Sequence, residues 1–387
     1  MNKILFVLGT RPEAIKLCPV LLHMRRRFAD FRVKLCVTAQ HRSMLDQVLR
    51  AFEVKPEHDL NLMQPAQTLA QSTARMMAAL EPVLQSEQPD MVLVQGDTTT
   101  TMCGALAAFY QKIPVGHVEA GLRTWDPCRP FPEEMNRVLT ARLTNLHFAA
   151  TDGAARNLQA EGVGREKIWV TGNSGIDAVL YVKDGLERGT LQGGEWPKLD
   201  PAKKLVVVTA HRRESFGDGF ENICAALADL ARRSDVQIVY PVHRNPNVLD
   251  PVNRRLADLE NVVLAPPLDY VAFVDLMRRS YMLISDSGGV QEEAPSLGKP
   301  ILIMRDKTER PEAVEAATAR LVGTDAGRIV KEASLLLDDA GEYARRSRVH
   351  NPYGDGRASS RISDAICSFF DRNRPEANLG KASRQIA

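Results

Sequence analysis

The sequence predicts an α/β protein built from two Rossmann-like, doubly wound domains, and three observations lead to this prediction. Short apolar runs alternate with helical patterns along all 387 residues. The apolar runs are nearly continuous, which is typical of parallel strands covered by helices on both faces. Twelve strand candidates exceed what one parallel sheet holds comfortably. We therefore expect a break near residues 170–190, with one domain on each side.

The first half of the chain contains six apolar runs, and a helical pattern follows several of them. The expected strands are Ile4–Leu8, Val33–Thr38, Met91–Gln95, Val115–Val118, Leu146–Ala149 and Ile168–Thr171. The expected helices are Pro12–Arg27, Thr68–Ser86, Thr98–Gln111 and Glu133–Thr144. This order of elements is the βαβ pattern of a parallel sheet.

The second half repeats this pattern after a stretch rich in Gly, Pro and Lys, residues 187–204, which we interpret as a loop. The expected strands are Leu205–Thr209, Gln237–Pro241, Val262–Leu264, Met282–Ser285, Ile301–Met304 and Arg320–Val322. The expected helices are Gly219–Arg233, Val271–Arg279 and Ser287–Leu297. We accordingly expect domains at 1–172 and 173–356, a helix at 357–375 that crosses back to the first domain, and a frayed tail at 376–387.

The composition limits the classes of partner. The net charge of +2 gives no support to a nucleic acid or a membrane surface as partner, and no apolar run is long enough to span a bilayer. The start of the chain is interpreted as a buried strand and not as a signal peptide. The six cysteines form no CxxC pair, which favours reduced thiols in a cytoplasmic protein and gives little support to a metal site.

The segment GTRPEAIK, residues 9–16, joins the first strand to the first helix. Thr10 is a candidate N-cap and Pro12 lies near the first helical position. Because a helix N-terminus attracts anions, Arg11 and Lys16 would add two cations to a phosphate site. The alternative is an ordinary turn whose charges are solvated.

Three carboxylates follow strands of the first half. Asp97 comes after the strand in LVQGDTTTT, Glu119 ends the strand in GHVEAG, and Glu133 begins a helix in PEEMNR. Ligands of open α/β sheets bind at the carboxyl edge of the strands, and converging carboxylates suit general acid–base chemistry. Two alternatives remain: Asp97 caps the following helix, and Glu133 and Glu134 are favourable charges in the first helical turn.

The second half offers groups suited to a nucleotide. His211 follows a strand and precedes two arginines, an arrangement that suits a departing phosphate. In DSGGVQEE, Ser287, Gly288 and Gly289 provide a hydroxyl and unhindered N–H groups, while Glu293 could accept the hydroxyls of a ribose. Arg310 adds a cation further along the chain.

Taken together, these segments resemble the non-hydrolysing UDP-N-acetylglucosamine 2-epimerases. The resemblance spans nearly the whole chain, through GTRPEAIK, TAQHR, GDTTTT, GHVEAGLRT, PEEMNR, TGN, HRRESFG, YPVH, DSGGVQEEAP, RDKTERPE and NPYGDG. It implies the architecture of family B glycosyltransferases, with two Rossmann-like domains facing a central cleft that holds the active site. It also implies a homodimer that needs neither a nicotinamide nor a metal ion.

The resemblance further implies roles for individual residues. The implied catalytic set is Asp97, Glu119, Glu133 and His211. The positions implied to hold UDP are Arg11, Lys16, Leu268, Phe273, Ser287, Gly288, Gly289, Glu293 and Arg310, with Leu268 acting through its main chain. The positions implied near an activating second UDP-GlcNAc are Gln40, His41, Arg137 and His243. Ser43 and Ala66 depart from the polar or charged residues of some members there.

The implied reaction is reversible epimerisation at C2 of UDP-N-acetylglucosamine, which supplies bacterial surface polysaccharide synthesis. It proceeds by anti elimination of UDP to 2-acetamidoglucal and re-addition of UDP. Three rivals remain open on the residues alone: an epimerase that releases ManNAc and UDP, a UDP-sugar glycosyltransferase, and a non-catalytic sensor of nucleotide sugars.

Overall fold

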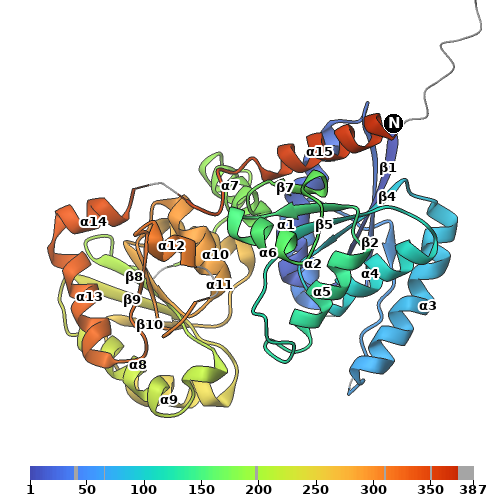
Figure 1. Ribbon diagram of the computed structural model, residues 1–387. Coiled ribbons are helices and arrows are strands. Elements are labelled where there is room, and N and C mark those ends of the chain that lie inside the picture. Colours follow the sequence, from blue (N-terminus) through green and yellow to red (C-terminus); the bar gives the residue numbers. More distant parts are fainter. Residues whose placement is uncertain (39–41, 65, 197–198, 309–310, 349–350, 374–387) are drawn as a thin grey trace, which may run out of the picture.

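Two parallel sheets, each covered by helices on both faces, form the two lobes seen in Figure 1 of the computed structural model. The structure describes residues 1–38, 42–64, 66–196, 199–308, 311–348 and 351–373. The expected pair of Rossmann-like, doubly wound folds is confirmed. Among the helices of these residues, none combines the length and the hydropathy that crossing a bilayer would require.

The first sheet has seven strands in the order β3-β2-β1-β4-β5-β6-β7. They are β1 (Asn2–Leu8), β2 (Phe31–Val37), β3 (His58–Asp59), β4 (Met91–Gln95), β5 (Val115–Ala120), β6 (Leu146–Ala149) and β7 (Ile168–Val170). The helices of this half are α1 (Arg11–Arg26), α2 (Arg42–Ala51), α3 (Leu69–Glu87), α4 (Thr99–Tyr110), α5 (Glu133–Leu143), α6 (Asp152–Ala160) and α7 (Ser174–Glu187).

The second sheet has six strands in the order β10-β9-β8-β11-β12-β13. They are β8 (Lys204–Thr209), β9 (Val236–Pro241), β10 (Val262–Ala265), β11 (Met282–Ser285), β12 (Ile301–Ile303) and β13 (Ala319–Leu321). The helices are α8 (Asp218–Leu230), α9 (Pro246–Leu256), α10 (Tyr270–Arg279), α11 (Gly288–Glu293), α12 (Pro311–Glu315), α13 (Ala326–Asp338), α14 (Ala340–Arg346) and α15 (Ala358–Arg372).

The sequence located all twelve expected strands to within about two residues at each end, and the structure adds β3. This two-residue strand pairs with β2 through Cys36 and His58, and it is too short to produce an apolar run. The helix expected at 287–297 ends at Glu293 and continues as a 3-10 turn, Ala294–Leu297. Pro295 explains the change, because proline lacks the N–H that an α-helix needs.

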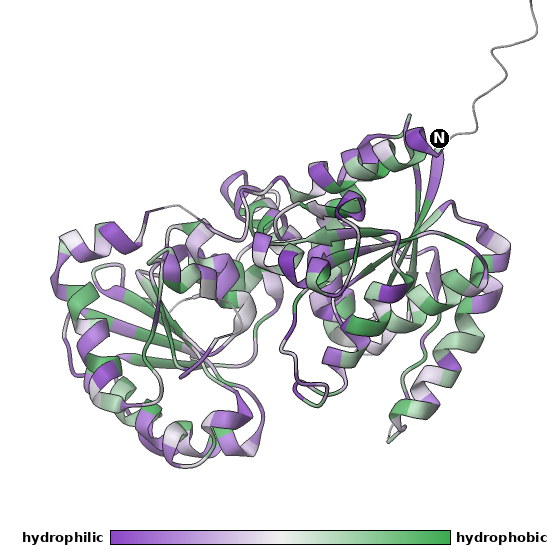
Figure 2. Ribbon diagram, viewed as in Figure 1, coloured by the Kyte–Doolittle hydropathy of each residue, from purple (hydrophilic) through white to green (hydrophobic). Residues whose placement is uncertain are grey.

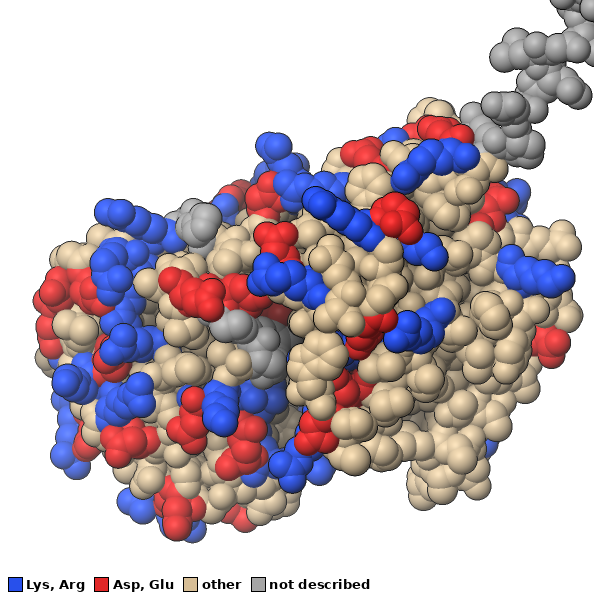
Figure 3. All heavy atoms as spheres, in the orientation of Figure 1, with Lys and Arg blue, Asp and Glu red and all other residues tan. Residues whose placement is uncertain are grey.

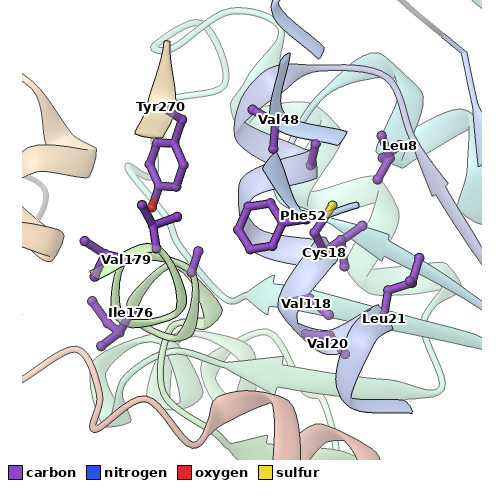
Figure 4. Close-up of a cluster of buried hydrophobic side chains, with 14 of the residues drawn as sticks. Leu8, Cys18, Val20, Leu21, Val48, Phe52, Val118, Ile176, Val179 and Tyr270 are labelled. Atoms are coloured by element: carbon purple, nitrogen blue, oxygen red, sulfur yellow. The ribbon is translucent and has the colours of Figure 1, made fainter. Parts of the chain in front are cut away.

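Helix α7 was not expected from the sequence, and it connects the two halves. It contacts α1 and α15 on one side and α10 and α11 on the other. Figure 4 shows Ile176 and Val179 of α7 near Tyr270 of α10, with Phe52 and Cys18 of the first half close by. The apolar cluster to which these residues belong therefore continues from one sheet to the other. Helix α15, which begins after the last turns of the second half, packs on α1.

The hydropathy pattern agrees with burial of both sheets. Figure 2 shows apolar strands within each lobe and polar residues on the outer faces of the helices. Leu5, Val92, Val207 and Ile284 have no exposed surface. In sheets buried on both faces, ligands bind at the carboxyl ends of the strands.

Candidate active site

The carboxyl ends of β1, β4 and β5 lie side by side, because these three strands are consecutive neighbours in the first sheet. They carry Gly9, Asp97 and Glu119, and the chain order reverses between β1 and β4. That reversal is the switch point at which open α/β sheets bind ligands. The sequence-predicted carboxylates Asp97 and Glu119 are thus on one edge.

Glu119 is held by two side chains from neighbouring elements. Lys16 Nζ of α1 forms an ion pair with Glu119 Oε1, and Gln95 Nε2 at the end of β4 donates to Oε2. The side chains of Lys16 and Glu119 are 16% and 8% exposed, so the interpretation of Lys16 as a solvated charge of an ordinary turn is wrong.

The backbone at Glu119 is unusual for a residue with a side chain. Its φ is 64°, and the pairing of β5 with β6 shifts register between Val118 and Ala120. Such bulges redirect side chains and are frequent next to active sites. Gly121 follows with a φ of 94°, and a Cβ there would lie 2.2 Å from the carbonyl oxygen of Ala154. The GHVEAG segment therefore requires glycine at its end.

Asp97 is bound by an arginine of α5. Arg137 donates to Asp97 Oδ2 through Nε at 3.0 Å and Nη2 at 2.7 Å, and its Nη1 donates to Glu134 Oε2 at 2.9 Å. Asn136 Nδ2 donates to the Asp97 carbonyl oxygen at 2.9 Å. The residue that caps α4 is Thr98, so the alternative interpretation of Asp97 as the cap is wrong.

Glu133 and Glu134 both lie in the first turn of α5, and their surroundings differ. Glu134 is buried and accepts the N–H groups of Thr124 and Trp125 at 3.0 and 3.1 Å, which fixes the preceding loop. Glu133 is half-buried, and within the described part of the chain it makes no hydrogen bond or ion pair. Its role in catalysis stays a prediction.

Glu13, a residue that the sequence analysis did not assign to the site, ties two of these strand ends together. Its buried carboxylate accepts the N–H groups of Gly9 at 3.0 Å and Thr10 at 2.7 Å. It also accepts the hydroxyls of Thr98 at 2.8 Å and Thr101 at 3.2 Å. Burial raises the pKa of Glu13. One carboxyl group thereby joins the turn that carries Arg11 to the turn that carries Asp97.

His117 supports the same edge from within the sheet. Its ring is buried, burial lowers its pKa to about 4, and the imidazole is therefore neutral near pH 7. Nε2 lies 2.7 Å from the carbonyl oxygen of Gly96, which can only accept, so Nε2 carries the proton. This bond fixes the backbone just before Asp97. A buried histidine inside an apolar strand gave no separate signal in the sequence.

In the second half, the carboxyl ends of β8 and β11 are neighbours and form the second switch point. His211 and Arg212 follow β8, and Asp286, Ser287 and Gly288 follow β11. Ser287 is the residue before α11, and its hydroxyl does not cap that helix. Gly289 is exposed, and a Cβ at this position would meet no atom within 4 Å.

Glu293 of the second half interacts electrostatically with cations of the first half. Burial, with a smaller contribution from the neighbouring Glu292, raises its pKa to about 8, whereas Tyr270, Lys16 and Arg11 oppose this rise. Tyr270 donates its hydroxyl to Glu293 Oε1 at 3.3 Å. The charges of Lys16 and Arg11, from the first half, therefore act on a carboxyl group of the second half.

His211 gives a second link between the halves. Burial lowers its pKa, Asp286 opposes the decrease, and the charges of His243, Arg212 and Arg11 add to it. Its ring stacks on that of His243 with centroids 5.7 Å apart. Figure 3 shows charged side chains of both signs where the two lobes meet. The candidate acid–base groups and the nucleotide-binding candidates thus converge between the lobes.

The remaining predicted residues fall into two groups. Leu268 lies two residues before α10 and Phe273 lies in the first turn of that helix. Both are half-buried and pack against the large apolar cluster. Gln40, His41 and Arg310 lie outside the described residues.

The fold and the site together define a two-domain α/β protein with acidic and nucleotide-type groups facing each other between its domains. Comparison with known proteins identifies the family. The chain belongs to the UDP-N-acetylglucosamine 2-epimerase family, whose model matches residues 23–367.

Two kinds of relative support this assignment. A UDP-N-acetylglucosamine 2-epimerase from Escherichia coli (strain K12) is 56% identical over 369 residues, which are 94% of this chain and 98% of that protein. The crystal structure of UDP-GlcNAc 2-epimerase from Neisseria meningitidis bound to UDP-GlcNAc has a TM-score of 0.87 and 46% identity, covering 95% of this chain and 100% of that chain. The Methanocaldococcus jannaschii enzyme in complex with UDP-GlcNAc and UDP has a TM-score of 0.77 and 32% identity, covering 95% and 99%.

Proposed function

We propose that this protein is a non-hydrolysing UDP-N-acetylglucosamine 2-epimerase that interconverts UDP-GlcNAc and UDP-ManNAc. The observation that carries the proposal is the convergence of Lys16 and Arg11 of the first half with Glu293 and His211 of the second. A nucleotide sugar bound between the lobes would contact both sets. The structural relative from N. meningitidis was solved with UDP-GlcNAc bound.

The chemistry of the substrate explains why several carboxylates are needed. The C2 proton is not adjacent to a carbonyl group, so it becomes acidic only when the C1–O bond breaks and C1 gains positive charge. UDP leaves with the electron pair of that bond, a carboxylate removes the C2 proton, and a C1=C2 double bond forms. Return of a proton to the other face of C2 and of UDP to C1 completes the epimerisation.

We assign the proton transfers to Glu119 and Asp97, with Glu133 as the third member of the catalytic set. Lys16 and Gln95 fix both oxygens of Glu119, and Arg137 holds Asp97. Such positioning is what acid–base catalysis requires of a side chain. Because Lys16 lies near both Glu119 and Glu293, a bound diphosphate would share this cation and leave Glu119 freer to accept a proton.

We assign the nucleotide to the second lobe. Glu293 faces a ribose, Ser287 and Gly289 face a phosphate, and His211 with Arg11 stabilises the charge that develops on departing UDP. Leu268, Phe273 and Gly288 complete the proposed contacts, and Arg310 keeps the role implied by the resemblance. No step of this scheme uses a metal ion or a nicotinamide.

A second UDP-GlcNAc would bind beside the first, because two of its proposed contacts touch the catalytic groups. Arg137 is bonded to Asp97, and His243 stacks on His211. An activator that contacts Arg137 and His243 would therefore alter the surroundings of both catalytic residues. Gln40 and His41 are the other proposed contacts.

We also propose a cytoplasmic homodimer that pairs through the first domain. Helices α4 and α5 pack on each other and expose Phe109, Tyr110, Met135 and Leu139, which are 56%, 67%, 38% and 45% exposed. Exposed apolar side chains concentrated on adjacent helices favour a protein interface. The domain limits 1–172 and 173–356 remain part of the proposal, with α7 as the connection about which the lobes close.

Proton NMR of UDP-GlcNAc in D₂O with the protein tests the proposed reaction. Loss of the C2 proton signal, with intact UDP-GlcNAc and UDP-ManNAc carrying deuterium, supports the non-hydrolysing epimerase. Free ManNAc with UDP would support the hydrolysing enzyme. Absence of exchange would contradict epimerisation and favour a transferase or a sensor.

A further inference from the structure

A carboxylate without any exposed surface lies behind His211. Asp286 follows β11, and its side chain is 0% exposed. Its Oδ2 accepts the backbone N–H of His211 at 2.6 Å and that of Arg212 at 2.7 Å. Two N–H donors can be satisfied only by an acceptor, so the orientation of the Asp286 carboxylate is fixed.

The other oxygen of Asp286 is directed at the imidazole. Within the described residues Oδ1 has no hydrogen bond, although it is buried, and His211 Nδ1 lies 3.3 Å from it. A buried acceptor without a donor is destabilising, so a small rotation of the ring toward Oδ1 is favourable. Stacking on His243 keeps the ring plane in place.

We infer that Asp286 is a positioning residue that keeps the proton of neutral His211 on Nδ1 and directs Nε2 away from the sheet, toward the bound diphosphate. The inference rests on the proposed function for the role of His211. Once Nε2 takes up the second proton of the ring from solvent, it donates that proton to the phosphate oxygen as UDP departs, while Asp286 stabilises the imidazolium from behind. Burial, His243, Arg212 and Arg11 all lower the pKa of the ring, and Asp286 is the group that opposes them.

The substitution Asp286→Asn removes the negative charge of the side chain and keeps its size and shape. The two N–H groups of His211 and Arg212 require the amide oxygen at the Oδ2 position, and the amide NH₂ then faces Nδ1. Neutral His211 must accept at Nδ1, and its proton moves to Nε2. An imidazolium would place N–H against N–H, so the pKa of His211 should be lower in the variant than in the parent.

The decisive measurement is ¹⁵N NMR of the histidine rings in the full-length protein without substrate. The chain has eight histidines, and the signals absent from His211→Gln assign residue 211. We expect the Nδ1–H tautomer in the parent and the Nε2–H tautomer in Asp286→Asn. An Nε2–H tautomer in the parent would overturn the inference, even if the variant failed to fold.

The second measurement is the pH dependence of kcat/KM for UDP-GlcNAc. The decrease of kcat/KM on the alkaline side of the pH profile should move to lower pH by about one unit or more in Asp286→Asn. The control is Asp275→Asn, which alters another carboxylate with no exposed surface, bonded to Arg278 and Arg279 away from His211. Its alkaline limb should match that of the parent, whatever its stability.

The two proposals fail in different ways. A parent protein that shows the Nδ1–H tautomer but does not exchange the C2 proton would refute the epimerase and leave the positioning by Asp286 intact. A parent that epimerises, with an unchanged limb and tautomer in Asp286→Asn, would refute the positioning alone.

Discussion

Glu293 should make the stability of the protein depend on pH between about 4.5 and 8. Burial is the main cause that raises its pKa from 4.5 to about 8, with a further contribution from Glu292. A carboxyl group with a raised pKa contributes stability that is complete below its unfolded value and is lost as the pH rises toward its folded value. The stability should therefore decrease from pH 5 to pH 8.

The size of this effect follows from the shift. A pKa that rises from 4.5 to about 8 corresponds to an upper bound of about 5 kcal/mol. Because the side chain is partly exposed, water screens the charge, and we expect a loss of about 2 kcal/mol. The substitution Glu293→Gln removes the ionisation and should flatten this part of the profile.

Urea unfolding at pH 5, 6, 7 and 8 measures the difference between the parent and Glu293→Gln. The control is Glu315→Gln, the same chemical change on an exposed side chain, which should keep the slope of the parent. If Glu293→Gln and the parent lose stability in parallel over this range, Glu293 does not titrate there and the argument from burial is refuted.

The other predictions concern the first lobe. Asp97→Asn and Glu119→Gln should each reduce kcat by at least ~10² and leave UDP affinity, measured by calorimetry, largely unchanged. Near-normal turnover in either variant would remove the substituted residue from the catalytic set. Lys16→Ala should lower kcat/KM by about 10-fold or more through loss of a charge-assisted contact, and binding of UDP-GlcNAc equal to that of the parent would contradict this role. Glu13→Ala leaves the N–H groups of Gly9 and Thr10 without their acceptor and should lower the free energy of unfolding in urea by about 2–5 kcal/mol. A loss below about 1 kcal/mol would show that the two turns are stable without Glu13.

The fold was predictable because each strand is buried on both faces and so appears as an unbroken apolar run. Runs such as Met91–Gln95 and Met282–Ser285 were located exactly. Helix α7 was missed although Ile176, Val179 and Val182 have helical spacing. These residues lie where a boundary was expected, and the helix has partners in both lobes, which local sequence does not reveal.

The candidate site was predictable only where residues follow strand ends. Asp97, Glu119 and His211 were predicted in this way. Glu13, Gln95 and Asp286 were not assigned, because their importance lies in partners that are distant in sequence. Gln95 reaches Glu119 across 24 residues, and Asp286 reaches the N–H of His211 across 75. Only the folded arrangement shows such contacts.

Positional isotope exchange tests the central claim, which is that UDP leaves C1 and returns within one site. UDP-GlcNAc with ¹⁸O in the bridge between C1 and the β-phosphorus is incubated with the protein, and ³¹P NMR follows the label in recovered UDP-sugar. Elimination predicts that ¹⁸O moves from the bridge to the non-bridging positions at a rate comparable with epimerisation, and that Glu119→Gln slows both. Epimerisation with all ¹⁸O retained in the bridge would contradict the account, because a β-phosphate that has left C1 and rotates returns through any of its three equivalent oxygens.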